Sequence, residues 1–108
     1  MIELENRYVL HIPKFKCVDG ELVALDIEEL LDGLFFELKK GGIISFYLTD
    51  IKSHYKSRVF DEVTVTVFAS SIQVEEIFKR WFRANNHVLG QESFSYEYGN
   101  RIIIEKLD

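Results

Sequence analysis

The clearest pattern of apolar and polar residues lies in segment 60–68, where valines at alternate positions are separated by Thr64 and Thr66. Alternation of this kind sends successive side chains to opposite faces of a β-strand. One face then packs on a core and the other meets a polar surface. The segment therefore predicts a strand with its valines in the core.

Other segments alternate in the same way and predict four further strands, at 7–12, 43–49, 92–97 and 101–106. In segment 43–49 we expect three apolar side chains to face inward, those of Ile44, Phe46 and Leu48. A slip of one residue exchanges the two faces of a strand, so the turn before 101–106 decides which side chains are buried. We favour a three-residue loop at 98–100, which pairs Tyr96 with Ile102, over a two-residue loop at 99–100.

Segment 14–24 has a weaker strand pattern around the pair Asp19-Gly20, which is favoured in type I′ turns. A short hairpin is one interpretation of this segment, and a plain loop is the other.

The first helix is predicted over 26–40, where apolar residues recur at helical spacing. Asp26 and Glu29 have the spacing of a capping box, and Gly41 follows two lysines at the end. Phe36 lies nearly opposite the apolar stripe. An outward phenylalanine indicates an interface, although a neighbouring segment such as 14–24 that covers it is an equal alternative.

A second helix is predicted to begin at Ser70 or Ser71 and to end at Asn85-Asn86. Its apolar residues share one face, and glutamates lie four positions before a lysine and an arginine on the other.

The predicted order is β-α-β-β-α-β-β, in a single compact domain over 1–108. We therefore expect the α+β class and a ferredoxin-like β-α-β-β-α-β fold with an extra C-terminal strand. In this fold an antiparallel sheet of order 2-3-1-4-5 carries both helices on one face.

The composition and charge of the chain limit its expected partners and location. The 108 residues carry a net charge of −5, which disfavours nucleic acid and anionic lipid as partners. Cys17 is the only cysteine, so no internal disulfide forms. The first residues do not resemble a signal peptide, and no apolar run is long enough to span a membrane. We expect a cytoplasmic protein without membrane contact.

No motif with catalytic, phosphate-binding or metal-ligand spacing is present. The three histidines are far apart along the chain, at positions 11, 54 and 87. Cys17 is better explained as a structural thiol than as a nucleophile. We therefore expect no catalytic residue, metal or cofactor, and lean against an enzyme.

The sheet face turned away from the helices is the first candidate surface. By alternation it carries Arg7, Val9, His11, Ser45, Tyr47, Thr49, Glu62, Thr64, Thr66, Ser93, Ser95 and Glu97. Such a face is either solvated or a docking surface for a second copy or another protein. With Phe36, the candidate interface residues are His11, Tyr47, Thr64 and Thr66.

Segment 52–58 is the second candidate, because it carries basic residues at every second position and no acid. As an extended connection it projects them to one side, where they contact phosphate or an acidic surface with a tyrosine available for stacking. The candidate contacts are Lys52, His54, Tyr55, Lys56 and Arg58. The alternative, a solubilising loop or lysine-protected edge, is favoured by the net acidity.

Our leading hypothesis is a non-enzymatic interaction or regulatory module that self-associates, as a homodimer for example, or binds a protein partner. The second is a nucleic-acid-associated protein using the basic segment 52–58. The third and weakest is a small-ligand binder or enzyme on the outer sheet face, built around His11 and Tyr47.

Overall fold

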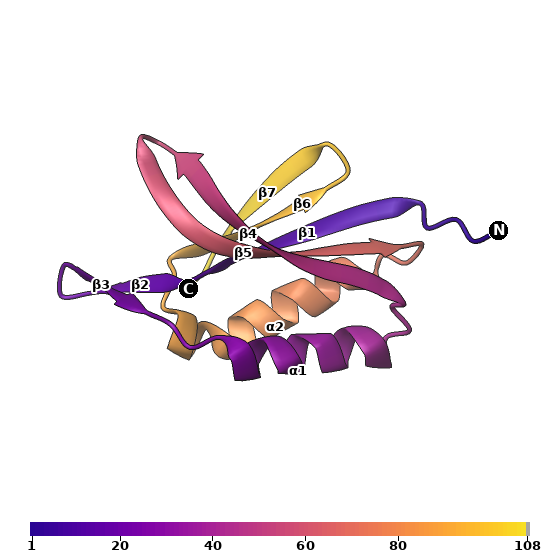
Figure 1. Cartoon of the computed structure of the whole chain (residues 1–108), viewed down its shortest axis with the longest axis horizontal. Helices are drawn as coiled ribbons and strands as arrows, with labels where there is room; N and C mark the ends of the chain where they lie inside the picture. Colours follow the sequence, from indigo (N-terminus) through magenta and orange to yellow (C-terminus); the bar gives the residue numbers. More distant parts are fainter. Residues whose placement is uncertain (108) are drawn as a thin grey trace.

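The computed structural model describes residues 1–107, which form seven strands and two helices (Figure 1). The strands are β1 (Asn6–Pro13), β2 (Phe15–Val18), β3 (Glu21–Ala24), β4 (Ser45–Tyr55), β5 (Arg58–Ala69), β6 (Ser93–Tyr98) and β7 (Arg101–Lys106). The helices are α1 (Glu28–Lys40) and α2 (Gln73–Leu89).

The strands form two sheets, and this corrects the expected fold class. A five-stranded antiparallel sheet has the order β4-β5-β1-β6-β7, while β2 and β3 form a separate two-stranded sheet. The ferredoxin-like assignment is therefore wrong. The additional hairpin forms because Asp19 and Gly20 both adopt positive φ, at 51° and 81°, and close a two-residue turn between β2 and β3.

Both helices lie against one face of the large sheet, and the core fills the space between these layers (Figure 1). Side chains of β1 and β5 that point toward the helices are almost fully buried, and they meet the inward stripe of α2. The side chains on this interface include Tyr8, Leu10, Ile12, Val65, Val67, Val74, Phe78 and Phe82. The alternation of valines and threonines therefore correctly predicted that the valines of segment 60–68 are buried in the core.

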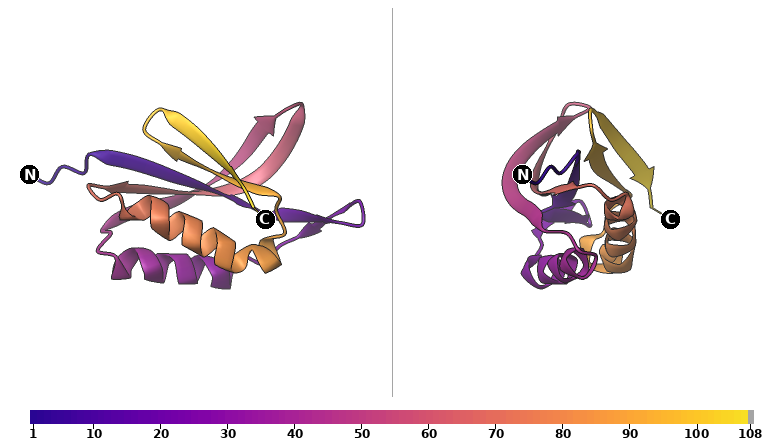
Figure 2. Two further views of the ribbon diagram at one scale, coloured as in Figure 1. Left: turned by 180° about the vertical axis from the view of Figure 1, so that it is seen from behind. Right: turned by 90° about the vertical axis from the view of Figure 1, so that its right-hand side faces the viewer.

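The outer strands bend away from the helices. Figure 2 shows the β4–β5 and β6–β7 hairpins rising from the sheet on the side opposite α1 and α2, so the sheet curves around its own outer face. The short β2–β3 hairpin instead projects beyond the body of the molecule (Figure 1). This curvature decides which residues of the outer face are accessible.

Segment 52–58 is not a connection between strands, as the sequence suggested. It is the closed end of the β4–β5 hairpin, where Lys56 and Ser57 adopt positive φ values of 48° and 63°. Tyr55 pairs directly with Arg58 across this turn. The turn was missed because Lys-Ser is not among the Asn-Gly or Asp-Gly pairs that favour positive φ.

The favoured loop between the last two strands is also wrong. Tyr98 pairs with Arg101 across a two-residue turn, and Tyr96 pairs with Ile103. Gly99 has φ of 59°, a conformation that glycine adopts without steric cost and that this turn requires. The consequence is that Ile102 and Ile104 face away from the helices.

Of the three side chains in segment 43–49 that were expected to face inward, only that of Phe46 packs against the core. Phe46 stacks on Phe35 of α1, with ring centroids 5.2 Å apart. Ile44, however, is 71% exposed because it precedes the strand, and Leu48 is 43% exposed.

The start of α1 and the end of α2 differ from the prediction. No side chain caps α1 directly, although the Asp26 carboxylate accepts a 3.4 Å hydrogen bond from the Glu28 amide. Helix α2 continues past Asn85-Asn86 and ends at Gly90, which adopts φ of 63°. Within the helix, the side-chain amide of Asn85 donates a 2.8 Å hydrogen bond to the carbonyl of Trp81. No helix within residues 1–107 is long and apolar enough to cross a membrane.

Candidate functional site

Figure 2 shows that the large sheet curves with the side away from the helices on the inside of the curve, and we call this side the concave face. Its floor consists of Val9 and His11 from β1 and Thr64 and Thr66 from β5, which are paired across the two central strands. All four are buried, with exposed fractions of 2% to 9%. Of the two interpretations of this face, the solvated one therefore does not hold at its centre, where these four residues are buried.

His11 is the central polar group of this floor. Its Nδ1 lies 3.1 Å from Oε1 of Glu62 on β5, and its Nε2 lies 2.7 Å from Oε2 of Glu97 on β6. Arg7, four residues earlier on β1, places its guanidinium 3.7 Å from the other oxygen of Glu97. One imidazole thus links three neighbouring strands through two carboxylates.

The pKa of His11 reflects two opposing effects. Burial favours the neutral ring and lowers the pKa, but the hydrogen bonds to Glu62 and Glu97 and their negative charges outweigh it. The pKa of His11 is therefore raised above its ordinary value of 6.5. The cationic imidazolium suits this place because both of its nitrogens are donors.

The two buried threonines have a structural role. The Thr64 hydroxyl donates to the Thr49 carbonyl of β4 at 3.2 Å. Thr66 is 3% exposed, and no buried side-chain nitrogen or oxygen in residues 1–107 lacks a hydrogen-bond partner. These side chains therefore form part of the floor and present little surface of their own.

The rim of the concave face is largely apolar. On the β4–β5 side it carries Tyr47 and Phe60, which are 49% and 39% exposed. On the β7 side it carries Ile102 and Ile104, which are 58% and 50% exposed. A concave surface with an apolar rim and a few converging polar groups is typical of small-ligand sites. Its carboxylates favour a cation, and its aromatic side chains suit a flat ring.

The structure brings together some of the residues singled out from the sequence and separates others. His11, Tyr47, Thr64 and Thr66 share the concave face. Phe36 is 64% exposed on α1, in the helix layer on the other side of the sheet. It therefore takes no part in this site.

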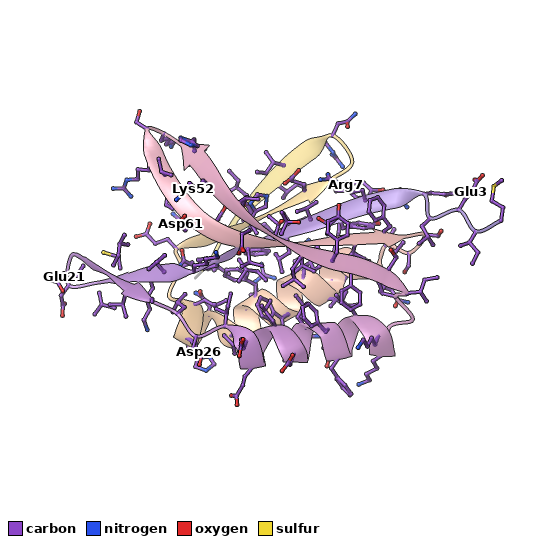
Figure 3. The ribbon with its side chains drawn as sticks, in the orientation of Figure 1. Glu3, Arg7, Glu21, Asp26, Lys52 and Asp61 are labelled. Carbon is purple, nitrogen blue, oxygen red and sulfur yellow. The ribbon has the colours of Figure 1, made fainter. Side chains whose placement is uncertain are left out.

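The basic residues of segment 52–58 do not share one side. Lys52 and His54 fall on the face of β4 opposite to Tyr55, and Arg58 pairs with Tyr55. Lys52 also donates to Asp61 at 2.7 Å, and Figure 3 shows the two side chains together on this hairpin. This hydrogen bond and the lysine charge hold the pKa of Asp61 below its usual value. The basic surface is thus divided and partly neutralised.

Lys56 lies at the turn itself, with its ammonium 5.4 Å from the centroid of the Tyr55 ring. The histidines at positions 54 and 87 lie at the hairpin end and in the last turn of α2, apart from His11. In the part of the chain that the structure describes, no group of three or more potential ligands is arranged to hold a metal ion.

Sequence reasoning placed Glu62 and Glu97 on the outer face but did not select them as site residues. Alternation gives the face of each strand, and it placed both glutamates on the same side as His11. It does not give the register between strands. The pairings of Pro13 with Glu62 and of Val9 with Glu97 bring these side chains to the imidazole.

Shallow grooves also run between the two helices, lined by Glu37, Lys40, Ile77, Arg80 and Trp81 among others. Arg80 is paired with Glu37 across the helices at 3.3 Å, and the Trp81 indole donates to the Leu30 carbonyl at 2.9 Å. These contacts join the helices, and the polar groups that make them are already satisfied.

Comparison with known proteins adds a fold relationship. No family model matches the chain, and no curated protein matches it. Two solved structures are similar to it over nearly their whole length. One is a phage SAM lyase in the apo state, with a TM-score of 0.66 and 13% identity, covering 100% of this chain and 96% of that one.

The other is a phage SAM lyase in complex with S-methyl-5′-thioadenosine. Its TM-score is 0.59 at 12% identity, and the match covers 94% of this chain and 89% of that one. At such identities the likeness shows a shared fold. It also corrects our leading hypothesis of a non-enzymatic interaction or regulatory module, because the two matched structures described above are of an enzyme.

Proposed function

We propose that this chain binds S-adenosylmethionine on the concave face and cleaves it as a lyase. The observation that carries the proposal is the likeness to a phage SAM lyase across essentially the whole of both chains. The third hypothesis from the sequence, a ligand site around His11 and Tyr47, points to the same surface. Fold alone does not determine function, so the chemistry of the face must also suit the substrate.

The concave face suits this substrate in two respects. S-adenosylmethionine carries a positive sulfonium and an ammonium group, and the carboxylates of Glu62 and Glu97 lie beside His11 on this face. Its adenine is a flat ring, and Tyr47 is half-exposed on the rim. We assign Glu62 to the sulfonium, Glu97 to the ammonium group and the rim to the adenosyl group.

In the proposed reaction the bond between sulfur and the γ-carbon of the methionine moiety breaks. The bonding electrons stay on sulfur, so S-methyl-5′-thioadenosine leaves as a neutral thioether. The substrate's own carboxylate attacks the γ-carbon and closes a lactone. This step balances without water, a proton or a cofactor.

The charge on sulfur disappears in this reaction, which limits what the carboxylates contribute. A negative group beside the sulfonium stabilises the substrate more than the transition state, so it assists binding more than the chemical step. The rate acceleration must then come mainly from holding the carboxylate of the substrate in line with the γ-carbon. The curved face provides surfaces on both sides of the ligand for this purpose.

A cytoplasmic location belongs to the same proposal, because the substrate is a cytoplasmic metabolite. The free, exposed Cys17 on the β2–β3 hairpin is compatible with a reducing compartment.

The test is to incubate the purified chain with S-adenosylmethionine and to follow S-methyl-5′-thioadenosine by liquid chromatography. Because the substrate also decomposes spontaneously, heat-denatured protein is the baseline. Glu62→Gln keeps the shape of the side chain and removes its charge, and we expect kcat/KM to fall about tenfold or more. Glu21→Gln, on the exposed β3 strand, is the matched control and should retain full activity. Product formation no faster than the baseline would overturn the proposal.

A further inference from the structure

The protonation state of His11 controls how many hydrogen bonds it can donate to the two glutamates. Both ring nitrogens lie within hydrogen-bond distance of a carboxylate oxygen, 3.1 Å to Glu62 and 2.7 Å to Glu97. The imidazolium can donate both hydrogen bonds, whereas the neutral ring carries one N–H and can donate one. Loss of a proton therefore leaves one glutamate without its donor.

The geometry indicates which glutamate loses its partner. The Nε2 contact to Glu97 is the shorter one, and Glu97 is also held by the Arg7 guanidinium at 3.7 Å. Glu62 has no second ion-pair or side-chain hydrogen-bond partner within residues 1–107. A neutral ring that keeps its proton on Nε2 turns the Nδ1 lone pair toward the Glu62 carboxylate. Two facing acceptors repel one another, so Glu62 is released toward the space above the floor.

We propose that His11 is a positioning residue that holds Glu62 and Glu97 while doubly protonated, and transfers Glu62 to a cationic ligand when it loses a proton. For the identity of the ligand, the inference rests on the proposed function. Binding then exchanges one cation for another: the ligand takes the place of the proton of His11, and that proton leaves to solvent. The charged groups that face the ring are Glu62 from β5 and Glu97 from β6, and Arg7 from the same strand as His11 contacts Glu97.

The enclosure of the cluster makes this exchange effective. The side chains of His11 and Glu62 are 10% and 16% exposed, so water screens their interaction poorly. A buried carboxylate that loses its only cationic partner is unfavourable until another cation replaces it. A cationic ligand is therefore favoured over a neutral ligand of the same shape.

The first test does not depend on catalysis. Proton–nitrogen correlation spectra of the imidazole rings, recorded from pH 5 to pH 9, report the tautomer and charge of each histidine. His11→Gln identifies the His11 signals by their loss. We expect both nitrogens to carry protons at low pH, and the Nε2–H tautomer after a titration above pH 6.5. A neutral His11 at pH 5, or an Nδ1–H tautomer, would overturn the transfer of Glu62.

The second test measures the protons released on binding. Sinefungin, which has an amine where S-adenosylmethionine has its sulfonium, is cationic and is not cleaved. S-adenosylhomocysteine is the neutral thioether with the same adenosyl and amino acid groups. Calorimetry in buffers of different ionisation enthalpy should show release of up to one proton with sinefungin and none with S-adenosylhomocysteine.

The affinity for sinefungin should rise by up to about tenfold per pH unit below the His11 titration, since one proton is exchanged. His11→Gln carries an amide that does not titrate, and it should remove both the proton release and the pH dependence. Sinefungin binding without proton release, or the same release in His11→Gln, overturns the role of His11 and leaves the proposed lyase activity standing. If sinefungin does not bind, the transfer to a cation is wrong, and formation of S-methyl-5′-thioadenosine decides the proposed function separately.

Discussion

His11 on β1 and Glu97 on β6 approach to 2.7 Å between Nε2 and Oε2, in a cluster where the imidazole is almost fully enclosed. Charge-assisted hydrogen bonds of this kind contribute about 1.5–3 kcal/mol. Because the pKa of His11 is raised in the folded state, this contribution depends on pH. It is fully present below the unfolded pKa near 6.5 and is lost as the pH rises through the folded value.

His11→Gln should therefore destabilise the protein by about 1.5–3 kcal/mol at pH 5.5, and by less at pH 8.5. Urea unfolding followed by the fluorescence of Trp81 gives the free energy at each pH. His54→Gln, at an exposed position on the β4–β5 hairpin, is the control and should change little at either pH. A cost for His11→Gln that is equal at both pH values would show that the charge of His11 contributes nothing.

The sequence predicted which face of the sheet the residues of this cluster occupy, but it did not predict that they lie next to one another. Alternation placed Arg7, His11, Glu62 and Glu97 on one face, because side-chain direction is a local property of a strand. Which residues of neighbouring strands lie side by side is not local. It depends on turn type, which the sequence predicted wrongly at two hairpins, and on sheet curvature, which alternation does not report.

Each of the two wrongly predicted turns is explained by interactions beyond the turn residues themselves. A Lys56-Ser57 turn with positive φ is held by the long β4–β5 pairing, despite residues that do not favour it. The Gly99-Asn100 turn was weighed against a longer loop on the assumption that Ile102 and Ile104 are buried. In the structure Ile103 packs against the core instead, and the other two line the concave face. These two isoleucines depart from the rule that apolar side chains face the core, and such departures are expected at functional surfaces.

The register of β7 can be tested at its turn. A Cβ on Gly99 would contact nothing within 4 Å, so Gly99→Ala isolates the cost of its positive φ. We expect a loss of about 1–2 kcal/mol in the free energy of unfolding. Gly33→Ala is the matched control, because Gly33 lies within α1 and its added methyl would also meet open space. That change should stabilise the protein by about 0.5–1 kcal/mol, since alanine favours the helix. Equal effects of the two substitutions would contradict the two-residue turn.

A second matched pair of substitutions compares a leucine in the core with a leucine on the exposed β2–β3 hairpin. Leu34 is fully buried between α1 and the sheet, and Leu34→Ala should cost about 2–5 kcal/mol. Leu22 on β3 is 75% exposed, and Leu22→Ala should stay within about 0.5 kcal/mol of the parent. Chemical denaturation of both variants measures this difference. A large loss at Leu22 would mean that the hairpin is covered in solution.

Alkaline pH should destabilise the fold through Tyr8. Its hydroxyl is buried and donates to the Ser71 carbonyl at 3.0 Å. Burial first, and then the neighbouring Tyr98, raise the pKa of Tyr8 from 10.0 to about 12. The unfolded chain therefore loses this proton first, and stability falls as the pH rises from about 10 toward 12.

Tyr8→Phe should lower stability by about 1 kcal/mol at pH 7, through loss of the hydrogen bond. It should also make the decline between pH 9 and pH 11 shallower than in the parent. Tyr47→Phe removes a half-exposed hydroxyl and is the control, which should follow the parent at every pH. Urea midpoints at pH 7, 9, 10 and 11 provide the measurement. A decline of the same steepness in Tyr8→Phe would assign the alkaline loss to other groups.

Self-association through α1 stays a prediction, and Phe36 is the residue that tests it. The side chain is 64% exposed on the side of α1 opposite the buried Leu31, Leu34 and Leu38. Covering an aromatic side chain contributes about 1.5–3 kcal/mol, which would add to the stability of a helix-to-helix contact. Light scattering behind gel filtration should then give a mass that rises with concentration for the parent. Phe36→Asp should keep the mass of a monomer, because an unpaired carboxylate is unfavourable in an apolar contact. Leu22→Asp introduces the same charge on the β2–β3 hairpin and should leave the association intact. A parent that is monomeric at every concentration, or a Phe36→Asp variant that associates equally well, would remove Phe36 from any interface.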